Sequence, residues 1–170
     1  MRERLNCLEE FKALQETCIK ARENEKRKVL VCCGTGCAAG IINEIINDLK
    51  LDDKEIHICM VNEDPKLLFL DGNLDTNWLF DIQRQQQIYA SNAIKKIQKI
   101  LTDKNIQVTE TAILTGNPAQ KIIEYSNDKN IDLIILGSRN KSKLDRFLTG
   151  SESKRVLENA TSDVWLARCK

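Results

Sequence analysis

Apolar positions along this chain follow two kinds of pattern that alternate. Short apolar runs without polar alternation are typical of strands buried on both faces, and they lie at 28–33, 55–61, 106–114, 131–136 and 163–168. Apolar residues that recur every three or four positions are typical of amphipathic helices, and they lie at 4–24, 41–49, 78–101 and 151–159. A further helix is predicted to begin at Pro118, because proline is favoured in the first helical turn.

Strands that alternate with helices predict an α/β fold. We expect a Rossmann-like, open, mostly parallel five-stranded sheet with helices on both faces, plus an extra N-terminal helix. Residues 1–26 are assigned to this helical extension, 27–170 to the α/β domain, and the aperiodic segment 62–77 to a long loop. Ligands of such sheets bind beyond the carboxyl ends of the strands, where the strand order reverses. The segments after Cys33 and after Leu136 are therefore the candidate ligand-binding loops.

Charge and composition narrow the classes of partner. Charged residues make up 30% of the chain, but the formal net charge is only +1, so no excess of basic residues favours nucleic acid. No apolar run reaches the length of a membrane span, and no signal-peptide core follows the first four residues. We expect a cytoplasmic protein that binds neither nucleic acid nor membrane. Most of the seven cysteines are expected to be reduced and apolar in role.

The segment GSRNKSKLDRFLTGS follows the fourth predicted strand. Glycines at Gly137 and Gly150 let backbone amides approach an anion closely. Ser151 is predicted at a helix start, where its hydroxyl and the exposed amides can hold a phosphate. The alternative is that Ser151 only caps the helix, although Lys154 stands where a full capping box has Glu or Gln. The residues themselves leave both interpretations open.

The spacing of Gly137, Asn140, Gly150 and Ser151 resembles the Gly-x2-Gly-x9-Gly-Ser/Thr motif of the universal stress protein family. The flanking segments DLIILGSR and SESKRVLENATSDVWLAR resemble the same family, as does Gly116-Asn117-Pro118-Ala119, and the likeness covers about 27–168. Two positions depart from the family pattern. Asn140 replaces a glycine, but asparagine tolerates left-handed backbone. Cys33 stands where nucleotide-binding members end the first strand with an acid, so no carboxylate is available there.

The resemblance implies a regulatory protein that binds ATP or another adenine nucleotide, with Val61 against the base. The binding residues that it implies are Gly34, Thr35, Val61, Leu136, Gly137, Asn140, Gly150, Ser151 and Glu152. It also implies a homodimer paired through strand 163–168, near Val164, Leu166 and Arg168. No acid–base pair or activated nucleophile is apparent, so we expect no catalytic residues and at most slow ATP hydrolysis. The alternatives are a nucleotide-free protein-interaction module of the same fold, with an unknown protein partner, and a thiol-based redox sensor.

The stretch VCCGTGCAAG has glycines one residue too far apart for a dinucleotide fingerprint, and it lacks the Gly-Lys-Ser/Thr of a Walker loop. Residues 1–50 also resemble the thioredoxin-like head of the NADH-binding subunit of bacterial NADH dehydrogenases and bifurcating hydrogenases. There Cys32 and Cys37 would supply one pair of ligands to a [2Fe–2S] cluster, but the second pair is missing, so we expect no cluster and no zinc. Cys32 and Cys33 are predicted to be core residues. Cys37 is the candidate reactive thiol, because the first turn of a helix favours thiolate.

Overall fold

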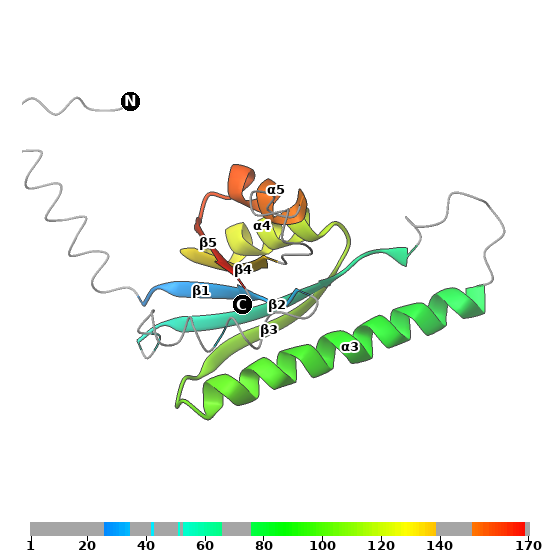
Figure 1. Ribbon diagram of the computed structural model, residues 1–170, viewed down its shortest axis with the longest axis horizontal. Coiled ribbons are helices and arrows are strands. Elements are labelled where there is room, and N and C mark those ends of the chain that lie inside the picture. Colours follow the sequence, from blue (N-terminus) through cyan, green and yellow to red (C-terminus); the bar gives the residue numbers. More distant parts are fainter. Residues whose placement is uncertain are drawn as a thin grey trace, which may run out of the picture.

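The computed structural model describes residues 26–34, 42, 51, 53–65, 76–138 and 151–168. Its five strands form one sheet in the order β3-β2-β1-β4-β5, and every neighbouring pair is parallel. The strands are β1 (Lys28–Cys32), β2 (Glu55–Asn62), β3 (Val108–Thr115), β4 (Leu133–Ser138) and β5 (Asp163–Arg168). The described helices are α3 (Thr76–Thr102), α4 (Pro118–Lys129) and α5 (Ser151–Asn159). Helix α3 covers one face of the sheet, and α4 and α5 cover the other (Figure 1). The predicted α/β fold with a five-stranded parallel sheet is confirmed.

Two apolar layers hold the sheet between its helices. Successive strand residues point to opposite faces, so a strand covered on both sides is apolar without interruption. In β1, Val29 and Val31 pack toward α3 together with Ile97, whereas Leu30 packs toward α4 and α5 together with Val156. All of these side chains are buried. The unbroken apolar run at 28–33 therefore reflects a central strand that contributes to both layers.

Two strands begin later than predicted, at Val108 and Leu133, because the isoleucines before them belong to helix ends. Asn105 and Asn130 adopt left-handed backbone, with φ of 61° and 52°. The next residues, Ile106 and Ile131, donate their amides to carbonyls five residues earlier, at 2.9 Å in both cases. This is the pattern of a Schellman motif, in which a buried apolar residue follows the left-handed cap. Ile106 and Ile131 are accordingly buried but lie outside the strands.

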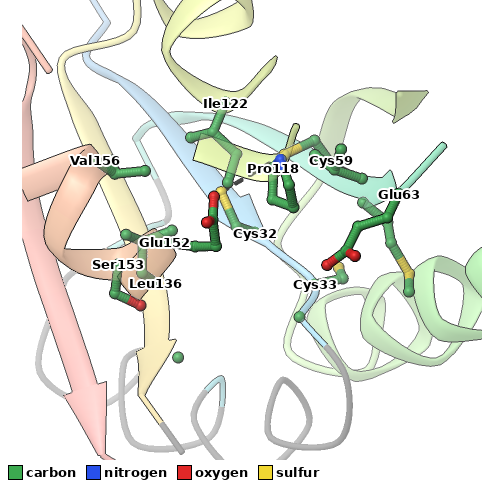
Figure 2. A pocket seen from close by; sticks show the side chains of 14 residues that line it. Cys32, Cys33, Cys59, Glu63, Pro118, Ile122, Leu136, Glu152, Ser153 and Val156 are labelled. Atoms are coloured by element: carbon green, nitrogen blue, oxygen red, sulfur yellow. Dashed lines mark hydrogen bonds between the residues drawn. The ribbon is translucent and has the colours of Figure 1, made fainter. Parts of the chain in front are cut away.

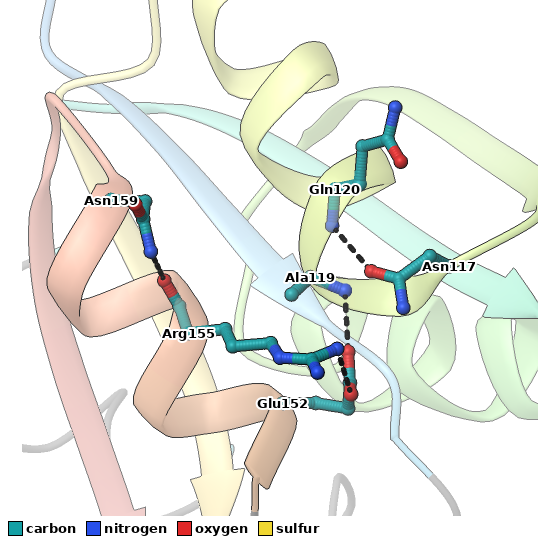
Figure 3. A network of polar contacts seen from close by, with 6 residues as sticks. All are labelled: Asn117, Ala119, Gln120, Glu152, Arg155 and Asn159. Atoms are coloured by element: carbon teal, nitrogen blue, oxygen red, sulfur yellow. Dashed lines mark hydrogen bonds and ion pairs between the residues drawn. The ribbon is translucent and has the colours of Figure 1, made fainter.

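Helix α4 begins at Pro118 as predicted, and a side chain caps it. The Asn117 side-chain oxygen accepts a hydrogen bond from the Gln120 amide at 3.0 Å. The cap satisfies one of the amides that a helix start leaves without a partner in the helix. Proline at the first position has no amide to satisfy. The start of α4 is thus fixed at the carboxyl-end side of the sheet, next to the start of α5 (Figure 3).

Several predicted elements lie outside the described residues. They are the N-terminal helix at 4–24, nearly all of the helix at 41–49, most of the loop at 62–77, and the segment 139–150. Of the helix at 41–49 only Ile42 is described, and it is helical and buried. Within the described part of the chain, no helix is both long enough and apolar enough to cross a membrane.

Candidate functional site

A cavity of about 240 Å³ lies at the carboxyl ends of β1, β2 and β4, with α4 and α5 on one side (Figure 2). The strand order reverses between β1 and β4, which pair directly, as at Val31 with Ile135. At such a switch point the two flanking connections lead away in opposite directions and leave a crevice. The cavity therefore occupies the position at which sheets of this class bind their ligands. Its lining comprises Cys32, Cys33, Gly34, Cys59, Met60, Val61, Glu63, Pro118, Ile122, Leu136, Gly137, Glu152, Ser153 and Val156.

The structure brings together at this cavity five residues that the sequence implies as nucleotide-binding, namely Gly34, Val61, Leu136, Gly137 and Glu152. Ser151 begins α5 and is exposed, and the next two residues line the cavity in its place. Thr35, Asn140 and Gly150 lie outside the described residues, as does Cys37. The role of these residues in binding stays a prediction.

The floor of the cavity is apolar and rich in sulfur. Cys32 and Cys59 face each other with their sulfurs 3.6 Å apart, and both are buried in the layer beneath α4 and α5. The contact with Cys59 and burial together raise the pKa of the Cys32 thiol well above its usual value. Burial likewise raises the pKa of Cys33, which packs in the opposite layer against α3. Cys32 and Cys33 are core residues, as predicted, and at neutral pH their thiols are neutral.

Position 33 is a poor place for the acid that the family pattern puts near the end of the first strand. Cys33 is only 2% exposed, and its amide donates to the Cys59 carbonyl at 2.7 Å, so it continues the pairing of β1 with β2. A carboxylate there would be buried without a positive partner from the neighbouring apolar layer. Gly34 is the first exposed residue after β1, and it lines the cavity.

Glu63 brings a carboxylate to the cavity from the next strand. It directly follows β2, the neighbour of β1, and its side chain is turned toward the cavity near Cys33 (Figure 2). Its backbone carbonyl accepts a hydrogen bond from the Gln86 side chain of α3 at 3.3 Å, which ties this turn to the helix. The sequence pattern does not reveal Glu63 as a site residue, because only the pairing of β1 with β2 places it beside the end of β1.

Glu152 joins α5 to the start of α4. Its carboxylate accepts a hydrogen bond from the Ala119 amide at 3.0 Å and pairs with Arg155 at 3.3 Å (Figure 3). An acid in the first turn of α5 also interacts favourably with the dipole of that helix. The family resemblance implies a nucleotide contact for Glu152, which stays a prediction; in the structure each of its two oxygens already has one protein partner. The contact between Glu152 and the Ala119 amide could not be predicted from the sequence pattern, because the two residues are 33 positions apart in the chain.

A second polar cluster lies outside the cavity, between β2, β3 and α4. The His57 Nδ1 atom lies 3.0 Å from the Tyr125 hydroxyl, and Glu110 pairs with Lys129 at 2.8 Å. Burial lowers the pKa of His57, and its Nε2 atom has no hydrogen-bond partner among the described residues. A neutral buried imidazole fits this environment. None of these four residues lines the cavity.

In the described part of the chain, no group of three or more His, Cys, Asp or Glu side chains is placed to hold a metal ion.

Comparison with known proteins gives relatives that align with this chain over most of its length and most of their own. Universal stress protein MJ0531 of Methanocaldococcus jannaschii is 26% identical over 151 residues, which cover 88% of this chain and 86% of that protein. The solved structure of MJ0577, from the same organism, has a TM-score of 0.68 at 21% identity and covers 85% of this chain and 96% of its own. A universal stress protein family protein from Arabidopsis thaliana, At3g01520, was solved with AMP bound. Its TM-score is 0.63 at 13% identity, with 85% of this chain and 92% of that chain covered.

The sequence profile of the universal stress protein family matches residues 26–168, from just before β1 to the end of β5. The matched region contains all five strands and the complete lining of the cavity. The solved structures, at identities of 21% and 13%, agree with this in fold. This chain therefore belongs to the universal stress protein family.

Proposed function

We propose that this protein binds an adenine nucleotide, ATP or AMP, in the cavity at the carboxyl ends of β1, β2 and β4, and that it acts as a regulatory protein. The observation that carries the proposal is the position of the cavity at the reversal of strand order, with glycines at the ends of both β1 and β4 lining it. The Arabidopsis thaliana relative with AMP bound has the same fold and supports the choice of ligand.

The cavity suits the base and the sugar of a nucleotide. Small-molecule pockets usually measure about 300–1,000 Å³, so the 240 Å³ described here holds only part of a nucleotide. Its floor is apolar, with Val61 and Leu136 on strand ends, and a flat aromatic base gains by leaving water for such a surface. The phosphates extend past Gly137 at the end of β4. Glu63 accepts hydrogen bonds from the ribose hydroxyls, because its carboxylate is the acid beside the end of β1.

We further propose a cytoplasmic homodimer formed through β5. This strand lies at one edge of the sheet and pairs only with β4 among the described strands. An edge strand presents backbone groups that a second copy can pair with. Nucleotide binding and assembly through β5 are therefore the proposed activities.

Thermal unfolding with and without ligand tests the nucleotide proposal. A ligand that binds only the folded state at about a hundredfold excess over its dissociation constant stabilises it by about 2.7 kcal/mol. For a chain of this size that raises the melting temperature by about 5–10 °C, at about 2–4 °C per kcal/mol. We expect such a shift with millimolar ATP or AMP.

Two variants of one residue make the test specific to the cavity. Apart from its chain neighbours, no described atom lies within 4 Å of a Cβ built on Gly34, so that Cβ enters open space at the cavity. Gly34→Leu should fill that space and remove the shift, whereas Gly34→Ala should keep most of it. If the folded wild type shows no shift with ATP, ADP or AMP, a nucleotide-free interaction module of the same fold replaces this proposal.

A further inference from the structure

Cys32, the last residue of β1, and Cys59, three residues before the end of β2, form a pair of thiols on neighbouring strands. They are direct partners in the parallel register of β1 and β2, and their sulfurs are 3.6 Å apart. Both side chains belong to the layer beneath α4 and α5. Cys33 follows Cys32 but packs in the opposite layer, so it is not part of the pair.

The separation of the two cysteines is within reach of a disulfide. Neighbouring strands lie about 4.8 Å apart, and disulfides join Cα atoms about 4.4–6.8 Å apart. To form a bond of about 2.0 Å, sulfurs that now lie 3.6 Å apart must approach by about 1.6 Å. Rotation of the two side chains and a small approach of β1 and β2, both at the boundary of a cavity, can supply that movement.

The cavity also decides which thiol meets a small reagent first. Both cysteines line it, but Cys32 is 8% exposed and Cys59 is fully buried. A reagent the size of water or peroxide that enters the cavity therefore has readier access to Cys32, and the Cys59 sulfur lies 3.6 Å from the Cys32 sulfur. This order, an accessible thiol backed by a second one, is that of an attacking and a resolving cysteine.

We propose that Cys32 and Cys59 are an oxidisable dithiol that closes to a disulfide on reaction with a peroxide. The Cys32 thiolate attacks one oxygen of hydrogen peroxide, the O–O bond breaks, and Cys32 sulfenic acid and hydroxide form. The Cys59 sulfur then attacks the Cys32 sulfur, its proton leaves with the sulfenic oxygen as water, and the S–S bond forms. The two sulfurs are oxidised by two electrons in total, and the peroxide is reduced to water and hydroxide.

The surroundings make this a slow reaction that accelerates with pH. The attacking species is the thiolate, and burial and the contact with Cys59 raise the pKa of Cys32. The titratable groups around it are Cys33 next in the chain, Glu152 from α5, Glu63 after β2, and Tyr125 of α4, whose own pKa burial raises. Below the pKa of Cys32, each pH unit should raise the rate about tenfold with the thiolate fraction.

Peptide mapping of the folded, full-length chain tests the proposal. The protein is treated with hydrogen peroxide, its free thiols are alkylated in denaturant, and tryptic peptides are compared by mass spectrometry with and without a dithiol reductant. The peptide with Cys59 should appear linked to the peptide with Cys32, and the chain should lose two hydrogen atoms. Because Cys32, Cys33 and Cys37 share one tryptic peptide, the double variant Cys33→Ala, Cys37→Ala assigns the link, which should persist in it.

The variants Cys32→Ala and Cys59→Ala should each lose the link, and melting curves establish that they are folded. Having both variants keeps the test decisive if one of them does not fold. The proposal is wrong if Cys59 stays fully open to alkylation after peroxide treatment of the folded wild type. It is also wrong if the link forms only after unfolding, or if it forms equally in folded Cys32→Ala.

Discussion

Glu152 offers a sharp test of the structure, because the family resemblance implies a ligand contact for it and the structure also gives it two contacts within the protein. Its carboxylate accepts from the Ala119 amide at the start of α4 and pairs with Arg155 at 3.3 Å within α5. We predict that Glu152→Ala destabilises the fold in the absence of any nucleotide. The start of α4 would lose an acceptor, and the first turn of α5 would lose its negative charge.

The magnitude follows from these contacts. A hydrogen bond to a charged group contributes about 1.5–3 kcal/mol, and the lower end applies because the Glu152 side chain is 36% exposed. The exposed ion pair with Arg155 adds only a few tenths of a kcal/mol, so we expect a loss of about 1.5–2 kcal/mol. That loss lowers the melting temperature by about 3–8 °C. Glu152→Gln keeps an acceptor for the Ala119 amide and should lose less than about 1 kcal/mol.

Glu158 on the same helix is the matched control. It pairs with Lys154 at 3.7 Å, both side chains are more than half exposed, and Glu158→Ala should change stability by less than about 0.5 kcal/mol. Urea unfolding of the three variants and the wild type measures the differences. The reasoning is refuted if Glu152→Ala and Glu158→Ala are equally stable. If Glu152→Gln also keeps the ATP-induced shift, the role of Glu152 is to hold the two helices together.

Three further predictions concern groups elsewhere in the fold. Burial lowers the folded-state pKa of His57, so the unfolded chain takes up the proton first, and stability should fall as pH drops below about 6.5, by at most about 1.4 kcal/mol per unit. Urea titrations should show that slope between pH 6.5 and 5 in the wild type and not in His57→Gln. Light scattering at micromolar concentration should give twice the 19.4 kDa chain mass, and the mass of one chain would remove the β5 dimer. Glu63→Gln should reduce the difference in thermal shift between ATP and 2′-deoxy-ATP, and an unchanged difference would exclude the ribose contact.

The sequence pattern predicts the strands well where an apolar run corresponds to a strand that is buried on both faces. Central strands such as β1 and β4 are covered on both faces, so their apolar runs are unmistakable. The predicted boundaries at 106 and 131 were too early, because a buried isoleucine after a helix cap has the same apolar signature as the first residue of a strand. An apolar run indicates buried residues, and residues outside strands can be buried too.

Only some of the residues that line the cavity could be predicted from the sequence. Gly34 and Gly137 follow predicted strands, and the rule for parallel sheets places them at one edge. Glu63 and the facing thiols of Cys32 and Cys59 depend on which strands are neighbours. The pattern of a single sequence does not contain strand order, because that order is fixed by packing between segments far apart in the chain. For this reason the sequence predicts Cys32 as a core residue but does not reveal its pairing with Cys59.

The charges around the cavity constrain how the proposed nucleotide lies. Two carboxylates line it, and Glu152 is neutralised by Arg155, whereas no described cation pairs with Glu63. Like charges at short range repel each other, so a triphosphate is disfavoured beside the exposed carboxylate of Glu63. Glu63 stands at the end of β2, and Gly137 stands across β1 at the end of β4. The sugar hydroxyls therefore belong on the β2 side, where a carboxylate accepts hydrogen bonds from them. The phosphates belong on the β4 side, where a glycine lets backbone amides approach them.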